Sequence, residues 1–410
     1  MAKTRSNVAL AVRPAARRAA GPETVRVDCA NDRDVNPKIA RFLAEKQPET
    51  PCLVVDLEAV AQSYAMLREH LPLARIFYAV KANPAPEIVA MLCGLGSNFD
   101  VASRGEIELC LGEGATPDRL SFGNTIKKER DIAFAYEKGI RLFAFDSAAE
   151  LDKLSRAAPG ARVFCRILVD CDGAEWPLSR KFGCSPEMAV DLLRQARSFG
   201  LDPYGVSFHV GSQQTDLDQW DNAIGRAARM FSLLAEADIA LRMVNIGGGF
   251  PARYRSAVPG IARYAAAVTN AMTKHFGNYL PEIIIEPGRS LVGDAGIIQS
   301  EVVLIAKKGY DEEKRWVYLD IGKFHGLAET MDESIKYRIT APGSAGPLGP
   351  TVLAGPTCDS ADILYEKTEY HLPLDLKVGD KVEILATGAY TSSYSSVGFN
   401  GFAPLKTYCI

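Results

Sequence analysis

The chain has 410 residues, of which 47% are hydrophobic, and a formal net charge of −3 at pH 7. This length suffices for one large core and a second domain, and the nearly balanced charge favours neither nucleic acid nor an anionic membrane as a partner. No apolar run approaches the roughly 18 residues that a membrane helix needs. The nine cysteines show no CxxC pair and the five histidines no metal-ligand spacing, so we expect a cytoplasmic protein without a metal site.

The first 24 residues differ from the rest because their only acid is Glu23. The bases of this segment are Lys3, Arg5, Arg13, Arg17 and Arg18. Such a segment resembles an organelle transit peptide, although a solvated, disordered tail is the more common explanation. We therefore predict a disordered extension over residues 1–28, followed by a strand within residues 29–50 that joins a β domain.

A regular alternation of strands and helices follows the apolar run CLVVDL (52–57). The predicted strands cover residues 76–81, 98–103, 119–124, 141–146, 162–168, 205–210, 243–247 and 282–286. Each of the first seven leads into a helical pattern whose apolar residues recur every three to four positions and which ends in glycine. Eight such units predict an α/β fold with a closed (β/α)8 TIM barrel over residues 51–295. Active sites of these barrels lie at the carboxyl ends of the strands.

The sequence pattern changes after Arg289. Short β-type runs separated by glycine and proline replace the alternation, and no crossover helix of barrel length remains. The clearest runs are GIIQSEVVLIAKKG, RWVYLDIG, TVLAGPTCD, LKVGDKVEILATGAY and LKTYCI. Residues 296–410 are therefore predicted to form a separate antiparallel β domain, a sandwich or a small barrel.

Polar motifs end several of the barrel strands. Lys81 in FYAVKAN (77–83) follows the first of them, and an amine in such a place can form a Schiff base once it is partly neutral, which burial favours. Taken alone, Lys81 is more often a snorkelling surface lysine. GGG at 247–249 can close backbone amides around an anion, and Ser212 and Arg289 would add a hydroxyl and a guanidinium, which suits a phosphate monoester. No GxxxxGK[ST] motif is present.

Two further strand ends indicate what carries the phosphate. Glu286 ends the buried run IIIEPG, where an unpaired carboxylate would be costly unless it meets a cation. A protonated pyridine nitrogen is such a cation, and its protonation makes the ring a strong electron sink. His209 could stack on that ring, although a satisfied core histidine is the commoner case. Together the motifs predict pyridoxal 5'-phosphate, held covalently by Lys81.

Nine motifs in order resemble those of the fold-type III, alanine racemase-like, pyridoxal phosphate-dependent decarboxylases, and most closely ornithine decarboxylases of the bacterial branch. The motifs are FYAVKANPAPEIV, FDVASRGEIE, RKFG, VSFHVGS, NIGGGFP, EPGRSLV, GPTCDSAD, GAYTSS and FNGF. The resemblance runs from about residue 36 to the C-terminus. It implies a barrel with a β domain and a head-to-tail homodimer whose two active sites lie at the subunit interface.

The resemblance also implies a role for each matching residue. Lys81 is similar to the Schiff-base lysine, and Asp100 and Glu106 to the carboxylates that orient it and the ring. Arg166 is similar to an arginine of the barrel site, His209 to the ring-stacking histidine and Glu286 to the pyridinium partner. The implied phosphate cradle comprises Ser212, Gly247, Gly248, Gly249, Gly288, Arg289 and Tyr390. From the other subunit, Cys358 is similar to the acid that protonates Cα, Asp359 to the acceptor of the substrate's distal ammonium, and Phe399 to a wall of the site.

The implied reaction is decarboxylation of L-ornithine to putrescine, a step of polyamine biosynthesis, with L-lysine to cadaverine as a second activity. One segment departs from the family pattern: residues 318–333 (YLDIGKFHGLAETMDE) replace a stretch that carries a second substrate-binding aspartate. Its equivalent here is Asp320 or none, which leaves the preferred side-chain length open.

Four alternatives differ in what the sequence would show. A diaminopimelate decarboxylase would resemble CES rather than CDS at 358–360 and would need cations for a distal carboxylate. An alanine racemase would place arginine rather than Glu286 against the ring nitrogen. A non-catalytic homologue that binds a regulatory partner would be expected to lose Lys81 or the phosphate ligands. A single-barrel cofactor carrier would lack the β domain.

Overall fold

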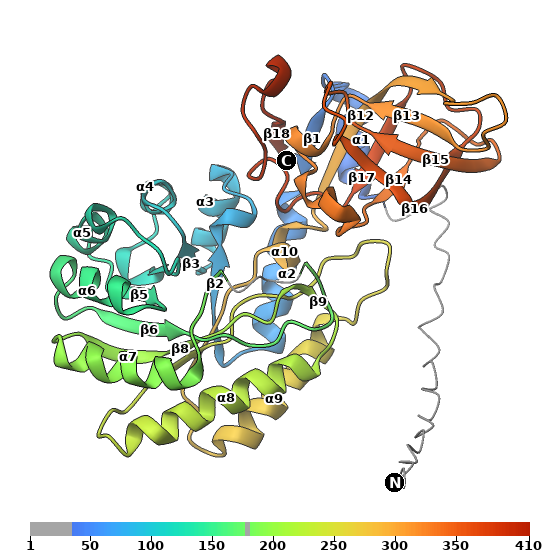
Figure 1. The fold of residues 1–410 in the computed structure, drawn as a ribbon. Helices are drawn as coiled ribbons and strands as arrows, with labels where there is room; N and C mark the ends of the chain where they lie inside the picture. Colours follow the sequence, from blue (N-terminus) through green and yellow to red (C-terminus); the bar gives the residue numbers. More distant parts are fainter. Residues whose placement is uncertain (1–34, 177–180) are drawn as a thin grey trace, which may run out of the picture.

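The computed structural model describes residues 35–176 and 181–410 of the chain, so the extension predicted over residues 1–28 lies outside the described residues. A parallel barrel wrapped by helices lies next to a β domain, and the N-terminal segment of the described chain runs beside the C-terminal strands (Figure 1). In this part of the chain no helix combines the length and the apolar character required to cross a bilayer.

The eight predicted barrel strands are confirmed. They are β2 (Ala74–Ala79), β3 (Asn98–Val101), β4 (Leu120–Phe122), β5 (Leu142–Phe145), β6 (Arg162–Arg166), β8 (Asp202–Ser207), β10 (Met243–Asn245) and β11 (Glu282–Ile285). They close in the order β10-β11-β2-β3-β4-β5-β6-β8. A small buried cluster that includes Phe77, Phe164 and Ile284 packs apart from the main core. The carboxyl ends of the strands therefore meet at one edge, where the polar motifs follow.

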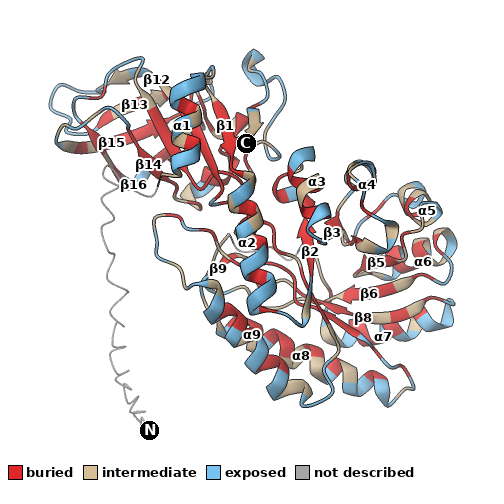
Figure 2. Cartoon of the chain, turned by 180° about the vertical axis from the view of Figure 1, so that it is seen from behind, coloured by how far each residue is buried: buried red, intermediate tan, exposed pale blue. Residues whose placement is uncertain are grey.

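Helices alternate with these strands as the glycine-terminated patterns predicted. They are α2 (Leu57–His70), α3 (Pro86–Gly94), α4 (Arg104–Gly112), α5 (Glu129–Glu137), α6 (Ala148–Ala157), α7 (Pro186–Ser198), α8 (Asp218–Ala235), α9 (Ile261–Phe276) and the short α10 (Arg289–Val292). Serine side chains at positions 103, 147 and 185 accept the third backbone N–H of α4, α6 and α7. Figure 2 shows the buried faces of these helices turned toward the strands and the exposed faces turned outward.

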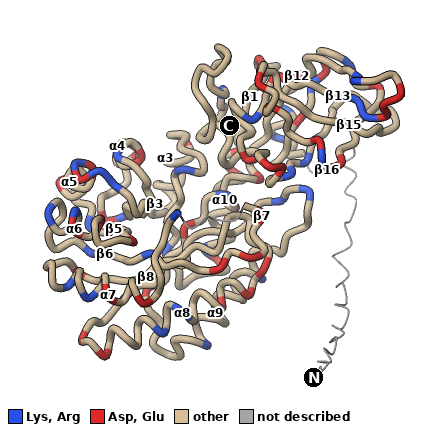
Figure 3. Tube along the Cα trace, viewed as in Figure 1, with Lys and Arg blue, Asp and Glu red and all other residues tan. Residues whose placement is uncertain are grey.

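The separate β domain is confirmed. Its strands are β1 (Cys52–Val55), β12 (Gly296–Ala306), β13 (Arg315–Leu319), β14 (Arg338–Thr340), β15 (Leu348–Ala354), β16 (Ile363–Pro373), β17 (Lys381–Leu385) and β18 (Lys406–Cys409). The sheet is mixed rather than wholly antiparallel, because β13 pairs with β15 and β1 with β18 in parallel. The long connection from β13 through β14 lets β15 return in the same direction. Acidic and basic residues are interspersed over both domains (Figure 3).

The strand predicted within residues 29–50 is wrong for the described part of that range. Residues Pro37–Lys46 form the helix α1, whose first N–H groups are accepted by Asn36 and whose Ile39 and Leu43 are buried on one face. The strand lies further along, at β1, which pairs with β12 and β18 in the β domain. The CLVVDL run thus belongs to the β domain and not to the predicted barrel range that begins at residue 51.

Two short antiparallel strands, β7 (Ala174–Trp176) and β9 (Ser212–Gln214), lie beside the mouth of the barrel. The two domains are joined by hydrogen bonds at the same place. Asn83 donates its side-chain amide to the carbonyl of Gly388 over 2.9 Å, and the backbone N–H of Tyr390 donates to Ala82 over 2.8 Å. These contacts bring a segment of the β domain against the carboxyl end of β2.

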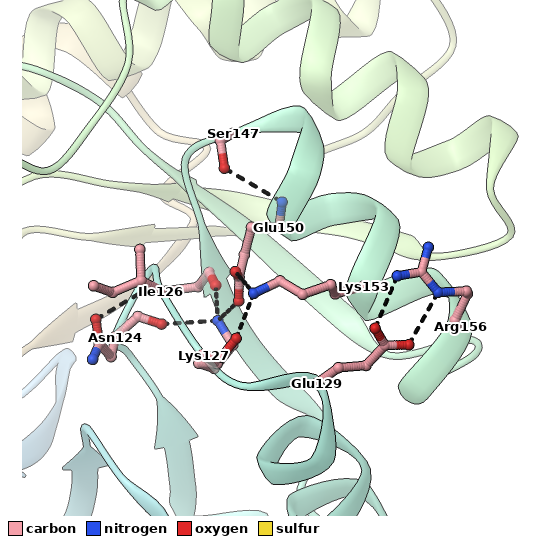
Figure 4. Close-up of polar contacts among 9 residues, drawn as sticks. Asn124, Ile126, Lys127, Glu129, Ser147, Glu150, Lys153 and Arg156 are labelled. Atoms are coloured by element: carbon pink, nitrogen blue, oxygen red, sulfur yellow. Dashed lines mark hydrogen bonds and ion pairs between the residues drawn. The ribbon is translucent and has the colours of Figure 1, made fainter.

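A buried ionic cluster fixes the loop between β4 and α5 (Figure 4). The ammonium of Lys127 contacts a Glu150 carboxylate oxygen at 3.0 Å and donates to the carbonyls of Asn124 and Ala144. Lys153 contacts the other Glu150 oxygen at 2.5 Å. The Lys127 side chain is fully buried, and burial lowers its pKa to about 8 despite the opposing pull of Glu150. The cluster therefore ties the β4 loop to β5 and α6.

Candidate active site

A polar pocket lies at the carboxyl ends of the barrel strands. Its lining consists of Ala79, Lys81, His209, Ser212, Gly248, Gly249, Phe250, Glu286, Gly288, Arg289 and Tyr390. Nine of these eleven residues were predicted site residues, including Tyr390, which arrives from the β domain; Ala79 and Phe250 are additional. Most of the motifs dispersed over 300 residues of sequence thus converge at one site.

Lys81 follows β2 directly, in a single helical turn (Val80–Ala82), and its side chain is 50% exposed. Its ammonium lies 3.8 Å from a carboxylate oxygen of Asp100. Burial alone would lower the pKa of Lys81, but Asp100, Tyr390 and Glu286 together raise it above its usual value. The expectation of a lowered pKa is therefore wrong in this arrangement, because the surrounding carboxylates outweigh burial.

Asp100 ends β3 at the floor of the site. One of its oxygens faces Lys81, while the other is buried without a hydrogen-bond partner among the described residues. A Cβ on Gly123 would lie 1.9 Å from that second oxygen, so only glycine leaves room for the carboxylate. Glu106 acts one step away, accepting the backbone N–H of Ala102 over 2.7 Å. It braces the end of β3 without lining the pocket.

Glu286 directly follows β11 and is tied to the neighbouring glycine turn. Its backbone N–H donates to Gly247 over 2.8 Å, and its carboxylate accepts the side-chain amide of Asn245. Asn245 in turn accepts the N–H of Gly247 over 2.9 Å. Burial, then repulsion from Asp100, raises the pKa of Glu286 to about 7. A cation placed against this carboxylate would be strongly stabilised. Asn245 was not among the predicted site residues, although an asparagine ending a buried strand is itself a signal.

His209 is held as a neutral ring. Burial, aided by the nearby cations Arg166 and Lys81, keeps its pKa well below the usual 6.5. The backbone N–H of Gly211 donates to Nδ1 over 3.1 Å, which assigns the ring proton to Nε2. A neutral imidazole suits packing on an aromatic cation better than a charged one does.

The glycine triplet allows close backbone approach. Gly247 and Gly249 have φ of +68° and +98°, a region that side-chain-bearing residues rarely adopt. A Cβ on Gly248 would lie 2.6 Å from the carbonyl oxygen of Glu286. Ser212 and the guanidinium of Arg289 face this turn, so hydroxyl, guanidinium and glycine backbone converge as phosphate recognition requires.

The groups of the site match the phosphate, the aldehyde and the ring nitrogen of pyridoxal phosphate. A phosphate cradle lies at one end, an amine that can bind an aldehyde lies at Lys81, and a buried carboxylate that favours a cation lies at Glu286. Residues 57–293 match the family model described as "Pyridoxal-dependent decarboxylase, pyridoxal binding domain". The chain belongs to the pyridoxal-dependent decarboxylases. Its cofactor is pyridoxal 5'-phosphate.

Relatives match over nearly the whole chain. The lysine/ornithine decarboxylase of Selenomonas ruminantium is 38% identical over 370 residues, which cover 89% of this chain and 90% of the relative. The lysine/ornithine decarboxylase of Vibrio vulnificus, solved with cadaverine, superposes with a TM-score of 0.81 at 32% identity and covers 91% of this chain and 98% of its own. Antizyme inhibitor 2 of Xenopus laevis is 34% identical over 385 residues, 90% of this chain and 83% of the relative.

This decarboxylase-family chain also holds a site residue that the motifs did not indicate. Glu329 lies in the helical turns of Ala328–Glu333, and its two carboxylate oxygens contact the two terminal nitrogens of Arg289 at 2.6 and 2.7 Å. Arg289 also meets the Tyr254 hydroxyl at 2.6 Å and the Ser212 hydroxyl at 3.1 Å. The guanidinium is therefore held by the Glu329 carboxylate along one edge and meets the Ser212 hydroxyl along another.

Arg166 ends β6 near the pocket without lining it. Its guanidinium lies 5.3 Å from the ring centre of Phe182. Burial lowers the pKa of Arg166, while the charges of Glu286 and Asp100 oppose that shift. Arg166 thus adds positive potential beside both carboxylates.

Three residues predicted to act from another subunit lie away from the pocket of their own chain. Cys358, Asp359 and Phe399 are exposed on loops of the β domain. The backbone N–H of Cys358 donates to Asn400 over 3.2 Å, and the Phe399 ring lies 4.8 Å from that of Phe324. These loops hold the three side chains on the outside of the domain.

Asp320 is not brought to Lys81 within one chain. One of its oxygens accepts the Ser300 hydroxyl at 2.5 Å and the N–H of Glu301 at 2.9 Å, and the residue lines a cavity inside the β domain. Asp320 therefore does not line the Lys81 pocket of its own chain.

Proposed function

We propose that this protein decarboxylates a basic L-amino acid, with L-ornithine as its main substrate and putrescine as the product. The observation that carries the proposal is the convergence of Lys81, Asp100, Glu286 and the phosphate cradle in one pocket. The names of the relatives support the substrate class, since lysine/ornithine and ornithine decarboxylases recur among them.

The proposal assigns a task in this reaction to each of the main residues of the site. Pyridoxal phosphate, when bound, supplies the electron sink that accepts the electron pair left by departing CO₂. Lys81 would bind it covalently, Glu286 would hold a proton at its pyridine nitrogen, and the neutral His209 would pack against its ring. Arg289, fixed by Glu329, holds the phosphate end. The site thus binds, orients and protonates; the net reaction replaces the carboxylate on Cα by one proton.

The final proton and the selection of substrate are assigned to a second subunit. In the proposed homodimer, Cys358 of one chain delivers the proton to Cα in the other chain's site, and Asp359 accepts the distal ammonium of the substrate. Phe399 forms a wall. The exposure of all three on β-domain loops supports this arrangement.

L-Lysine, which gives cadaverine, is the second candidate substrate, because relatives are named for both amino acids. Diaminopimelate is disfavoured, since its distal carboxylate would face Asp359 rather than a cation. A non-catalytic role is the alternative of another class, because one relative is named as an inhibitor. The presence of Lys81 and the complete cradle argues against it.

The deciding experiment incubates purified protein and pyridoxal phosphate with ornithine, lysine, arginine or diaminopimelate and measures released CO₂. We expect the highest kcat/KM with ornithine and none above background for the Lys81→Ala variant. Release from diaminopimelate alone would replace the proposed substrate class. Absence of CO₂ from all four amino acids, with cofactor bound, would favour the non-catalytic alternative.

A further inference from the structure

We propose that a cavity in the β domain is a second, non-catalytic site for an organic cation that carries two or more ammonium groups. The cavity has a volume of about 880 Å³ and lies between the C-terminal end of α1 and one face of the sheet. It is distinct from the Lys81 pocket and shares no lining residue with it.

The pairing of β12 with β17 builds the floor of this cavity. Ile297 pairs with Leu385, Gln299 with Glu383, and Glu301 with Lys381, so residues two apart place all three pairs on one face. The apolar pair is covered by Ile39 and Leu43 of α1. Because α1 ends at Lys46, the two polar pairs remain uncovered and line the cavity.

Glu383 is the observation that points to a ligand. Its residue is only 6% exposed, yet its carboxylate makes no hydrogen bond or ion pair with any residue in the described ranges. Its cross-strand neighbour Gln299 is 9% exposed and likewise has no side-chain partner there. A buried carboxylate without a donor or a cation is costly, so a bound cation that contacts Glu383 would be strongly favoured. Burial also raises the pKa of Glu383.

The remaining charges of the cavity set the chemistry of its ligand. Glu301 is paired with Lys381, whereas Asp320 accepts only a hydroxyl and a backbone N–H. Glu49 adds a third acid at the rim. The described His, Cys, Asp and Glu side chains nowhere gather in a group of three that could hold a metal ion. Acids that are spread over a large cavity suit a molecule whose ammonium groups are themselves separated.

The walls between these acids are apolar enough for a hydrocarbon chain. Ala44 of α1 and Pro342 lie along the cavity. An aliphatic diamine or polyamine combines separated ammonium groups with methylenes that can pack on such surfaces. If the proposed function holds, the enzyme's own product belongs to this class, and the occupancy of the cavity would rise with the product concentration. The ligand class itself rests only on the cavity.

Calorimetric titration of the holoenzyme with putrescine tests the proposal. The Glu383→Gln variant should bind one putrescine per chain fewer than the wild type, with ornithine kcat and KM unchanged. Glu137→Gln, the same substitution at an exposed position of α5, is the matched control and should bind as the wild type does. Ala44→Phe should weaken putrescine binding at the same site by narrowing the cavity, without altering any charge.

Three results would overturn the proposal. Equal putrescine stoichiometry in the wild type, Glu383→Gln and Ala44→Phe would show that the cavity binds no diamine. Loss of ornithine turnover in Glu383→Gln would place the residue in the catalytic site instead. Magnesium chloride that binds with Glu383-dependent stoichiometry and displaces putrescine would make the cavity a metal site. If ornithine yields no CO₂ while Glu383 still controls one putrescine per chain, the proposed function fails and the second site stands.

Discussion

Arg289 and Glu329 face each other edge to edge inside the protein. The two nitrogen–oxygen distances are 2.6 and 2.7 Å, and the side chains are 2% and 4% exposed. Glu329 belongs to the segment 318–333, whose sequence departs from the family pattern. The pair places the carboxylate on one edge of the guanidinium and leaves the edge that meets Ser212 for the phosphate. Glu329 therefore neutralises the buried charge of Arg289, to which the proposed function assigns the cofactor phosphate as a second partner.

The Glu329→Gln variant should make the stability of the protein depend on its cofactor. Removing one partner of a buried pair typically costs about 3–5 kcal/mol, because the remaining charge is uncompensated. The cofactor phosphate supplies a second anion to Arg289, so the loss should be smaller in the holoenzyme. Calorimetry should show a larger fall in Tm for the apoprotein than for the holoenzyme. Glu108→Gln, which breaks an exposed pair with Arg104, should lower neither. Equal falls in both forms would contradict this role.

Glu286 predicts how the stability of the apoprotein depends on pH. Its pKa is raised by burial to about 7, from an ordinary value of 4.5, so the folded state binds the proton more tightly than the unfolded chain. The resulting stabilisation is complete below about pH 4.5 and is lost as the pH rises through 7. Glutamine at position 286 stays neutral at every pH, so Glu286→Gln should raise the apoprotein Tm at pH 8 but hardly at pH 5. The gain in the free energy of unfolding should be larger at pH 8 than at pH 5 by on the order of 2 kcal/mol. A pH-independent difference would show that the carboxylate does not titrate in this range.

The cluster around Lys127 makes a prediction of non-additivity. Lys127→Met should destabilise the protein by about 3–5 kcal/mol, because two carbonyls lose their donor and buried Glu150 keeps only Lys153. Adding Glu150→Gln to Lys127→Met should lower the free energy of unfolding by less than the same substitution does in the wild type, because it removes the charge that Lys127→Met left uncompensated. Denaturant unfolding of the two single variants and the double variant measures the coupling. Strictly additive losses would show that the two groups do not interact.

The local sequence pattern predicted the barrel, because each strand is a short apolar run between helical repeats. Since the strands of such a barrel are parallel, the polar residues that follow them must lie at one edge. It did not reveal Glu329, whose partner Arg289 is 40 residues away, because that contact depends on how the two domains pack. Tyr390 was predicted in the site only through the family resemblance, since no local pattern relates it to Lys81. The helix α1 was missed although half of its ten residues are apolar. Asn36, Pro37 and the spacing of Ile39 and Leu43 were the available signals.

The assignment of Cys358 to the other chain's site predicts complementation. Homodimers of Lys81→Ala and of Cys358→Ala should each be nearly inactive. A mixed dimer has one site with both wild-type residues and one with neither, so random exchange should restore up to about a quarter of wild-type activity. The measurement is CO₂ release from ornithine after subunit exchange, with each parent mixed with itself as the control. Verified exchange without recovery would place both residues in the site of one chain.

Asp359 is the residue on which the substrate assignment depends most. Next to Cys358, the Asp359 carboxylate is exposed in a single chain. Among the described residues it accepts only the N–H of Ala361, at 2.8 Å, so it remains available for a cation. Once a dimer interface excludes water, loss of one partner of such a charged pair costs about 2–5 kcal/mol. Asp359→Asn should therefore lower kcat/KM for ornithine about tenfold or more. Cofactor affinity should not change, because Asp359 is assigned neither to the phosphate nor to the ring of the cofactor.

The same variant separates the class of substrate from its length. Asp311→Asn, an exposed aspartate on another β-domain loop, is the matched control and should leave the kinetics unchanged. Wild-type enzyme should prefer ornithine over lysine, yet one methylene is worth only about 1–3 kcal/mol in a fitted pocket. Equal kcat/KM for the two amino acids would make the enzyme dual-specific and leave the role of Asp359 intact. Unchanged ornithine kinetics in Asp359→Asn would remove the residue from the substrate site, and with it the reason for choosing a substrate that ends in an ammonium group.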